Sequence, residues 1–175
     1  MRISMISGPG AGKDTVASAI FHKMKVDGYS VEFVTEYVKQ WTYVSRKPEP
    51  WDQPYLFGKQ LNRELQVIRA GFDHLITSSP IMLNCYYGMR CNFDGWNELL
   101  DIAKKFEEQY PALYIFLERS DAEYNQKSRF HTEDQSKEID KELIRFLGSN
   151  IGDYIYSSVK DIDKIYDAVI NGLKN

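Results

Sequence analysis

The sequence has 175 residues, of which 43% are hydrophobic and 27% charged, a composition typical of one globular domain rather than of a disordered or fibrous chain. Its formal net charge of -3 argues against non-specific binding along a nucleic-acid duplex. The two cysteines, Cys85 and Cys91, lack the paired spacing and neighbouring histidines of a zinc site. The amino terminus becomes polar and glycine-rich too early for a signal peptide, and no long apolar run follows, so we expect a soluble, cytoplasmic protein.

Apolar segments of strand length alternate with segments of helical period along the chain. The predicted strands, in chain order, are residues 2–6, 31–35, 74–78, 113–117 and 154–157. The predicted helices are residues 13–25, 54–70, 80–88, 96–110, 132–147 and 161–173. This alternation predicts one α/β domain over residues 1–175, with three layers in which a parallel five-stranded sheet is flanked by helices. Ligands of such folds bind at the carboxyl ends of the strands, so functional residues are expected there.

A glycine-rich segment, GPGAGKDT, lies between the first predicted strand and the first predicted helix, which is the setting of a phosphate-binding loop, or P-loop. Its backbone N–H groups can surround a phosphate, and a lysine at the helix start adds positive charge. The alternative is an ordinary turn with a surface lysine. Because Gly-Lys-x-Thr resembles the loop of adenylate-kinase-like enzymes, and no base-reading Asn-Lys-x-Asp motif is present, a kinase is favoured over a GTPase. The predicted ATP-binding residues here are Gly8, Gly10, Ala11, Gly12, Lys13, Asp14 and Thr15.

Two positions of this loop depart from the common pattern: Ser7 replaces a glycine, and Asp14 replaces the hydroxyl residue that usually binds magnesium. A carboxylate would repel the triphosphate unless a metal ion lay between them, so Asp14, with Thr15, is predicted to hold Mg²⁺ directly or through water. The alternative role of Asp14 is helix capping. The third predicted strand ends at Ser78, where many P-loop proteins have an acid, and Ser79 either joins the substrate site or caps the next helix.

Glu36 directly follows the second predicted strand, so its carboxylate is expected at the same edge of the sheet. Kinases that phosphorylate a hydroxyl use a carboxylate to position it and take its proton, which makes Glu36 the first candidate base. The alternative is a solvated glutamate at a helix start. Aromatic and cationic residues crowd the following segment and suit a stacked base with a phosphate nearby, although most aromatics of a small domain are core. The predicted substrate-binding residues are Glu36, Lys39, Trp41, Arg46, Lys59 and Ser79.

A cationic segment follows the fourth predicted strand and ends at a capping box formed by Thr132 and Gln135. A mobile lid with arginines at this point can close over ATP and neutralise charge in the transferring phosphoryl group. Arg129 is the first candidate for this catalytic role, and Arg119 is the second candidate for nucleotide binding. Either arginine can instead form a surface salt bridge. His131 is expected to be a loop residue.

The sequence resembles a family of P-loop kinases and ATPases that is found widely in bacteriophages and is related to bacterial ribosylnicotinamide kinases. The resemblance rests on four blocks in this order: GPGAGKDT, VTEYVKQW, DQPYLFGKQLNRELQ leading to ITSSPIML, and ERSDAEYNQKSRFHTEDQSKEID. It implies ATP and Mg²⁺ as cofactors, Glu36 near the acceptor and Arg129 near the phosphates. The chain departs from the family at Asp14, usually Ser or Thr, and at Ser78, usually Asp.

Some phage members of this family phosphorylate 5-hydroxymethyluridine within DNA, and relatives of similar size phosphorylate free nucleosides or nucleoside monophosphates. The resemblance therefore implies an ATP-dependent phosphotransferase of a phage-infected bacterium, with a hydroxyl of a nucleoside, a nucleotide or a modified DNA base as acceptor. Two alternatives stay open: a non-catalytic ATP-binding switch, favoured by the uncharged Ser78, and a kinase of an unrelated small alcohol. The sequence does not determine the oligomeric state.

Overall fold

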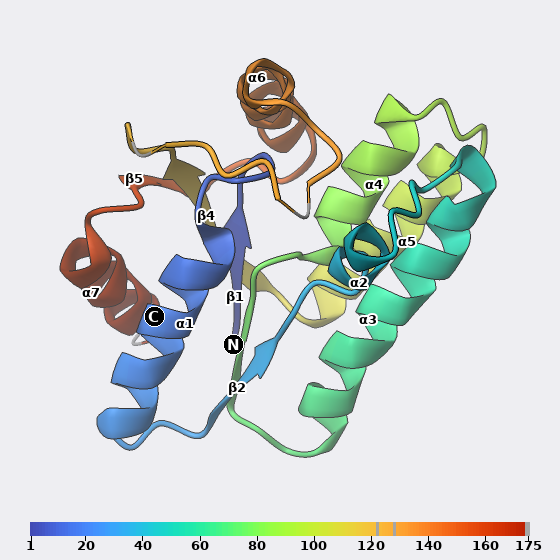
Figure 1. Ribbon diagram of the computed structural model, residues 1–175. Coiled ribbons are helices and arrows are strands. Elements are labelled where there is room, and N and C mark those ends of the chain that lie inside the picture. Colours follow the sequence, from blue (N-terminus) through green and yellow to red (C-terminus); the bar gives the residue numbers. More distant parts are fainter. Residues whose placement is uncertain (122, 128, 174–175) are drawn as a thin grey trace.

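The computed structural model describes residues 1–121, 123–127 and 129–173, and it confirms the predicted α/β fold (Figure 1). Parallel strands form one five-stranded sheet in the order β2-β3-β1-β4-β5. The strands are β1 (Arg2–Ile6), β2 (Val31–Val34), β3 (His74–Thr77), β4 (Ala112–Glu118) and β5 (Ile155–Ser158). The helices are α1 (Lys13–Val26), α2 (Lys39–Tyr43), the 3₁₀ helix η1 (Pro50–Asp52), α3 (Gln53–Arg69), α4 (Ile81–Arg90), α5 (Trp96–Gln109), α6 (Glu133–Asn150) and α7 (Ile162–Gly172).

Helices cover both faces of the sheet and give the expected three layers. Helices α1 and α7 pack on one face, where Ile20 and Val169 join the strand residues Ile3 and Met5 in one buried cluster. Helices α3 to α6 lie on the other face, around a second cluster that includes Phe116 of β4. Figure 1 shows α1 and α7 on one side of the strands and α3 and α4 on the other. Strand β1 lies in the middle of the sheet, so the loop at its carboxyl end opens at the centre of one sheet edge.

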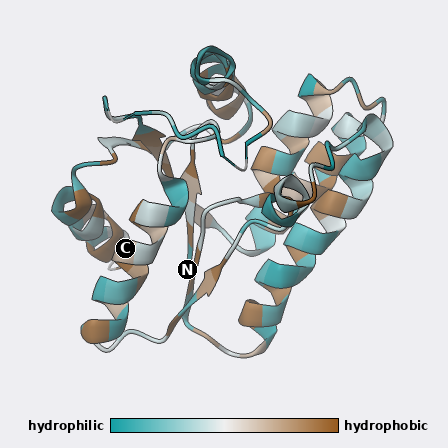
Figure 2. Ribbon diagram, viewed as in Figure 1, coloured by the Kyte–Doolittle hydropathy of each residue, from teal (hydrophilic) through white to brown (hydrophobic). Residues whose placement is uncertain are grey.

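Strand β4 illustrates why these sequences form a sheet that is buried on both faces. Ile115 and Leu117 belong to the cluster with α1 and α7, whereas Tyr114 and Phe116 belong to the cluster with α3 to α6. Successive side chains of a strand point to opposite faces, so a continuous apolar run fits a parallel sheet with helices on both sides. In Figure 2 the helices show hydrophilic turns outward, while the sheet is largely hydrophobic. Within the described ranges, no helix combines the length and apolarity needed to cross a membrane.

The segment between β2 and α3 contains two short helices, α2 and η1, that the sequence did not predict. Trp41 of α2 is buried, with 7% of its surface exposed, and the guanidinium of Arg46 lies 3.6 Å from the centre of its ring. The aromatic residues here have no regular apolar period, so burial of one large ring, rather than local propensity, stabilises this turn.

Two capping predictions have different outcomes. The capping box of Thr132 and Gln135 at the start of α6 is confirmed. The alternative role of Ser79 as a helix cap is wrong, because α4 begins at Ile81 after Pro80 and no side chain caps it. Instead, the Ser79 amide donates to the side chain of Thr77, which tightens the turn after β3.

Candidate active site

The P-loop leaves the carboxyl end of β1 and enters α1 at Lys13. Gly10 and Gly12 have φ angles of 80° and 101°, a left-handed conformation in which glycine avoids the steric strain of a side chain. The ammonium group of Lys13 donates to the backbone carbonyls of Ser7 and Gly8, over 2.9 and 3.1 Å. Burial lowers the pKa of Lys13, although the carboxylates of nearby residues act in the opposite direction. Lys13 is therefore held inside the loop by acceptors that a phosphate can replace.

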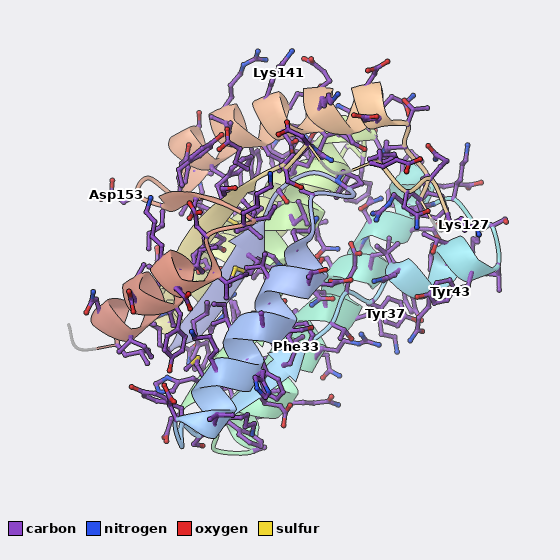
Figure 3. The ribbon with its side chains drawn as sticks, turned by 60° about the vertical axis from the view of Figure 1, so that its left-hand side comes forward. Phe33, Tyr37, Tyr43, Lys127, Lys141 and Asp153 are labelled. Atoms are coloured by element: carbon purple, nitrogen blue, oxygen red, sulfur yellow. The ribbon has the colours of Figure 1, made fainter. Side chains whose placement is uncertain are left out.

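A cleft of about 600 Å³ opens in front of this loop and extends between α2, α3, α4 and the segment that leads into α6. We call residues 119–131, between β4 and α6, the lid segment. Figure 3 shows Lys127 of the lid segment and Tyr43 of α2 on the same side of the molecule. The residues that line the cleft are Pro9, Gly10, Gly12, Lys13, Asp14, Thr15, Glu36, Val38, Lys39, Thr42, Lys47, Pro48, Gln53, Leu56, Asn84, Tyr87, Arg90, Cys91, Lys127, Arg129, Phe130, His131 and Gln135.

Glu36 reaches the cleft because α3 holds the chain that leaves β2. The amide of Tyr37 donates to the side chain of Gln60 over 3.1 Å, and Arg63 donates to the carbonyl of Thr35 over 3.1 Å. Burial raises the pKa of the Glu36 carboxyl, and the charge of Lys13 opposes this effect. A half-buried carboxylate with a raised pKa, in the same cleft as the P-loop lysine, has the properties of a general base.

Asp14 forms an ion pair with Lys39, so these two predicted site residues lie against each other. Burial alone would raise the pKa of Asp14, but hydrogen bonding to Lys39 and the nearby Ser78 hydroxyl holds this pKa below its usual range. The same pair raises the pKa of Lys39. Asp14 is therefore ionised at neutral pH, with an ammonium group on the side where we predicted a metal ion.

The residues around Asp14 fit a magnesium ion that takes most of its ligands from the bound nucleotide and from water. In the described part of the chain, no group of three or more His, Cys, Asp or Glu residues is arranged to hold a metal ion. Magnesium commonly uses only one or two carboxylates and takes its other ligands from phosphates and water. Asp14 can supply the carboxylate, and the fully buried hydroxyl of Ser78, which has no hydrogen-bond partner of normal geometry, can bind a metal-bound water.

The lid segment packs directly on the P-loop. A side chain at Gly10 would place its Cβ 2.5 Å from the ring of Tyr124, so only glycine allows this contact. The Tyr124 hydroxyl lies 2.8 Å from the carbonyl of His131, to which it donates, and 2.9 Å from the hydroxyl of Ser136. Arg129 donates to the carbonyl of Asn125 over 2.5 Å, and its charge acts on Glu36 across the cleft. Lys13, Glu36 and Arg129 therefore converge on one place.

Arg119 lies behind the loop and does not line the cleft. It forms an ion pair with Asp140 of α6 and donates to the carbonyls of Pro9, over 2.8 Å, and Ser136, over 3.0 Å. Asp140 also accepts a hydrogen bond of 2.6 Å from the amide of Gly8. A Cβ at Gly8 would lie 2.7 Å from Arg119, Asp140 and the backbone of Ser136. This network fixes the shape of the P-loop from behind, so Arg119 contacts the loop rather than the open site.

Among the predicted site residues, the cleft brings together Gly10, Gly12, Lys13, Asp14, Thr15, Glu36, Lys39 and Arg129. Gly8 and Ala11 belong to the loop without lining the cleft, and Ser79 is buried behind it. Three of the predicted substrate-binding residues do not line the cleft: Trp41, Arg46 and Lys59. Trp41 packs inward, Arg46 covers its ring and pairs with Asp52, and Lys59 lies 5.4 Å from the exposed ring of Tyr55. These cations stack on aromatic rings outside the cleft because that arrangement leaves their charge in water.

The sequence prediction missed several polar residues of the site. Gln53 and Asn84 are buried amides that line the cleft, and the Asn84 carbonyl oxygen has no hydrogen-bond partner. Asn84 lies one helical turn into α4, within the predicted helix 80–88, whereas Gln53 opens α3 one residue before the predicted helix 54–70. Each is a polar residue beside apolar residues at the start of a helix, and this pattern could have identified both as candidate site residues. Asp140 gave no comparable signal, because its contact with Gly8 joins residues 132 positions apart.

No protein-family model matches the sequence, and no curated protein matches it either. Among solved structures, the chain is similar to a deoxyadenosine kinase from M. mycoides with bound dATP, with a TM-score of 0.59, 17% identity and coverage of 100% of both chains. It is also similar to a structure of deoxyadenosine kinase from M. mycoides with bound dCTP, with a TM-score of 0.55, 18% identity and coverage of 99% of both chains. At these identities the likeness establishes a shared fold, a three-layer α/β arrangement, over nearly the whole length of the chain.

Proposed function

We propose that the protein is a kinase that transfers the γ-phosphate of ATP to a hydroxyl group of a nucleoside or nucleotide. The observation that carries this proposal is that Lys13 and Glu36 face the same cleft. One is a P-loop lysine suited to the β and γ oxygens, and the other is a carboxylate whose pKa is raised by burial. A donor site and an acceptor base in one cleft are the two requirements of phosphoryl transfer to an alcohol.

In the proposed reaction the acceptor hydroxyl gives its proton to Glu36, and its oxygen forms a bond to the γ-phosphorus. The bond from that phosphorus to the bridging oxygen breaks, and ADP leaves. Arg129, which has no ion pair among the described residues, neutralises charge on the moving phosphoryl group. Asp14, with Thr15 and water, would hold a magnesium ion, which would supply charge neutralisation at the phosphates.

The polar groups of the cleft support a base-containing acceptor. Gln53 and Asn84 present buried amide groups, and an unpaired buried carbonyl such as that of Asn84 gains stability from a donor on a ligand. The fold shared with deoxyadenosine kinase agrees with this acceptor class. A small alcohol would leave most of a cleft of about 600 Å³ filled with water, which makes it the weaker candidate.

Within this class, 5-hydroxymethyluridine in phage DNA is our specific candidate acceptor, on the basis of the sequence blocks that resemble phage kinases. Its reactive hydroxyl projects from the base, so the base must leave the stack to reach Glu36. The phosphate backbone of a DNA strand can contact the lysines that line the cleft, which are Lys39, Lys47 and Lys127.

The test is transfer of labelled γ-phosphate from ATP, with magnesium, to free nucleosides, nucleoside monophosphates, and DNA that contains either thymine or 5-hydroxymethyluracil. We expect label on at least one of these compounds and none on a Glu36→Gln variant. Label on the hydroxymethylated DNA alone identifies a DNA base kinase, whereas label on a free nucleoside or nucleotide identifies a salvage-type kinase.

One observation favours a second candidate, a non-catalytic ATP-binding switch. The ammonium group of Lys39 pairs with Asp14 in the position where we expect a metal ion, and Ser78 adds no charge there. A protein of this kind binds ATP and transfers no label to any compound of the panel. That result, together with tight ATP binding, would replace the kinase proposal.

A further inference from the structure

One part of the cleft gathers cationic side chains from three separate elements. Lys47 lies between α2 and η1, Arg90 is the last residue of α4, and His131 is the last residue of the lid segment. All three side chains line the same cleft, and the charges of Arg90 and Lys47 both act on the His131 ring. Lys127 lines the same cleft.

These charges are not neutralised by the residues of the cleft. The carboxylates that line it, among the described residues, are Glu36 and Asp14, and Asp14 already pairs with Lys39. Arg90 is oriented by an ion pair with Glu142 and by Tyr86, whose hydroxyl donates to the same carboxylate over 2.5 Å. Lys47 has no hydrogen bond or ion pair within the described ranges.

His131 is held in this part of the cleft by contacts of both its ring and its backbone. Its ring stacks on Tyr87 with 6.3 Å between ring centres and 29° between their planes, and its backbone carbonyl is held by Tyr124. Burial, with the charges of Arg90 and Lys47, lowers the pKa of His131. The ring is therefore neutral at pH 7 in the free protein, and a bound anion would stabilise its protonated form.

We propose that the acceptor carries a phosphate group in addition to its reactive hydroxyl, and that Lys47, Arg90 and His131 bind this phosphate; the inference rests on the proposed kinase function. An uncharged nucleoside would leave the Lys47 ammonium without an anionic partner, and it would give the Arg90 guanidinium no acceptor beyond Glu142. A phosphate accepts charge-assisted hydrogen bonds from the guanidinium, the ammonium and the imidazole together. The acceptor is then a nucleotide or a nucleic-acid strand rather than a free nucleoside.

The test compares binding of matched acceptors while magnesium and a non-hydrolysable ATP analogue occupy the donor site. The acceptors are 5-hydroxymethyl-2′-deoxyuridine, its 5′-monophosphate, a short single-stranded oligonucleotide that contains the same base, and the four common deoxynucleosides with their 5′-monophosphates. Calorimetry gives each affinity. We expect the phosphate-bearing member of at least one pair to bind about 10-fold or more tightly than its nucleoside, as one charge-assisted hydrogen bond predicts.

The variant Lys47→Gln should remove most of this difference and leave nucleoside affinity unchanged. Lys47 is exposed and unpaired within the described ranges, so its replacement should not disturb folding. The matched control is Lys141→Gln on the outer side of α6, which removes the same charge far from the cleft and should preserve the difference (Figure 3). Any of three results would overturn the inference. The nucleoside and its nucleotide bind with equal affinity, no phosphate-bearing compound binds, or Lys47→Gln lowers the affinities for nucleoside and nucleotide by the same factor.

The outcomes also separate this inference from the kinase proposal. Lys47-dependent binding of a nucleotide without transfer of label would remove the kinase function and keep the phosphate site. Transfer of label to free nucleosides as efficiently as to nucleotides would keep the kinase and remove the phosphate site. A preference for the oligonucleotide over the monophosphate identifies a nucleic-acid strand as the source of the phosphate, and the opposite preference identifies a free nucleotide.

Discussion

The two ends of the cleft are built in different ways. The donor end is one continuous segment, the P-loop with the start of α1, and its binding groups are backbone amides and Lys13. The acceptor end consists of side chains from α2, α3, α4 and the lid segment, which are far apart in the sequence. A change at the donor end should therefore affect every acceptor equally, whereas a change at the acceptor end should alter the choice among acceptors.

The largest effect is expected for Lys13→Met at the donor end. It removes the positive charge at the transferring phosphate, so kcat should fall by about 10³-fold for every acceptor. Lys13 is a half-buried cation, so removing its charge offsets the loss of its two hydrogen bonds, and the thermal stability should change little. Steady-state rates with two different acceptors test this, and a loss confined to one acceptor would contradict the proposed division of the cleft.

Glu36→Gln should lower kcat by about 10²- to 10⁴-fold, because no base remains to take the hydroxyl proton. ATP affinity should be unchanged. Burial raises the pKa of Glu36, so the carboxyl gains its proton at a higher pH than an ordinary glutamate does. The wild-type rate should therefore fall as the pH decreases through this raised value, and the residual rate of the variant should lack this acidic limb. A variant with full turnover would exclude Glu36 as the base.

Asp140→Asn should raise the KM for ATP by about 10-fold and leave the KM for the acceptor unchanged. The substitution weakens the bond to the Gly8 amide and leaves Arg119 without its carboxylate, so the loop loses its fixed shape before ATP arrives. The measurement is a pair of KM values. Equal increases for both substrates would mean that Asp140 supports the fold in general rather than the donor end.

Asp14→Ser should shift the magnesium concentration required for half-maximal rate upward several-fold, since the metal loses a carboxylate ligand. It also frees Lys39 from its ion pair. Titration of magnesium at saturating ATP measures the shift. An unchanged requirement would remove the metal-binding role of Asp14 and leave its pairing with Lys39 as its main contact.

Arg46→Gln should have the smallest effect. It removes an exposed ion pair and a cation–π contact with Trp41, a loss of about 0.5–1 kcal/mol in the free energy of unfolding. Both KM values should stay within about twofold of the wild type, because Arg46 lies outside the cleft. Denaturant unfolding and the two KM values test this, and a large rise in the acceptor KM would return Arg46 to the substrate site.

The sequence predicted the donor end well because its signals are local. A strand, three glycines, a lysine and a helix follow each other directly, and this order alone defines a P-loop. The sheet was predictable for a similar reason, since apolar runs such as residues 113–117 report burial on both faces. Glu36 was found from its position at the end of β2.

The side chains of the acceptor end were harder to predict, because the residue types in a segment do not determine the direction in which each side chain points. Arg46 and Lys59 have the character expected of substrate contacts, yet both stack on aromatic rings outside the cleft. Arg119 was expected at the nucleotide but binds Asp140 and the carbonyl of Pro9. These outcomes depend on contacts between residues distant in sequence, which no local pattern encodes.

Asp140 and Arg119 have a consequence for how far the lid segment can move. Arg119 begins this segment and donates to the carbonyl of Pro9 in the P-loop and to the carbonyl of Ser136 in α6, while Asp140, two turns into α6, accepts from the Gly8 amide. The start of the lid segment and the helix that follows it are thus both attached to the same loop. Arg129 lies between these two attachments, which bound how far it can move from the P-loop. The same two attachments therefore keep the arginine at the cleft.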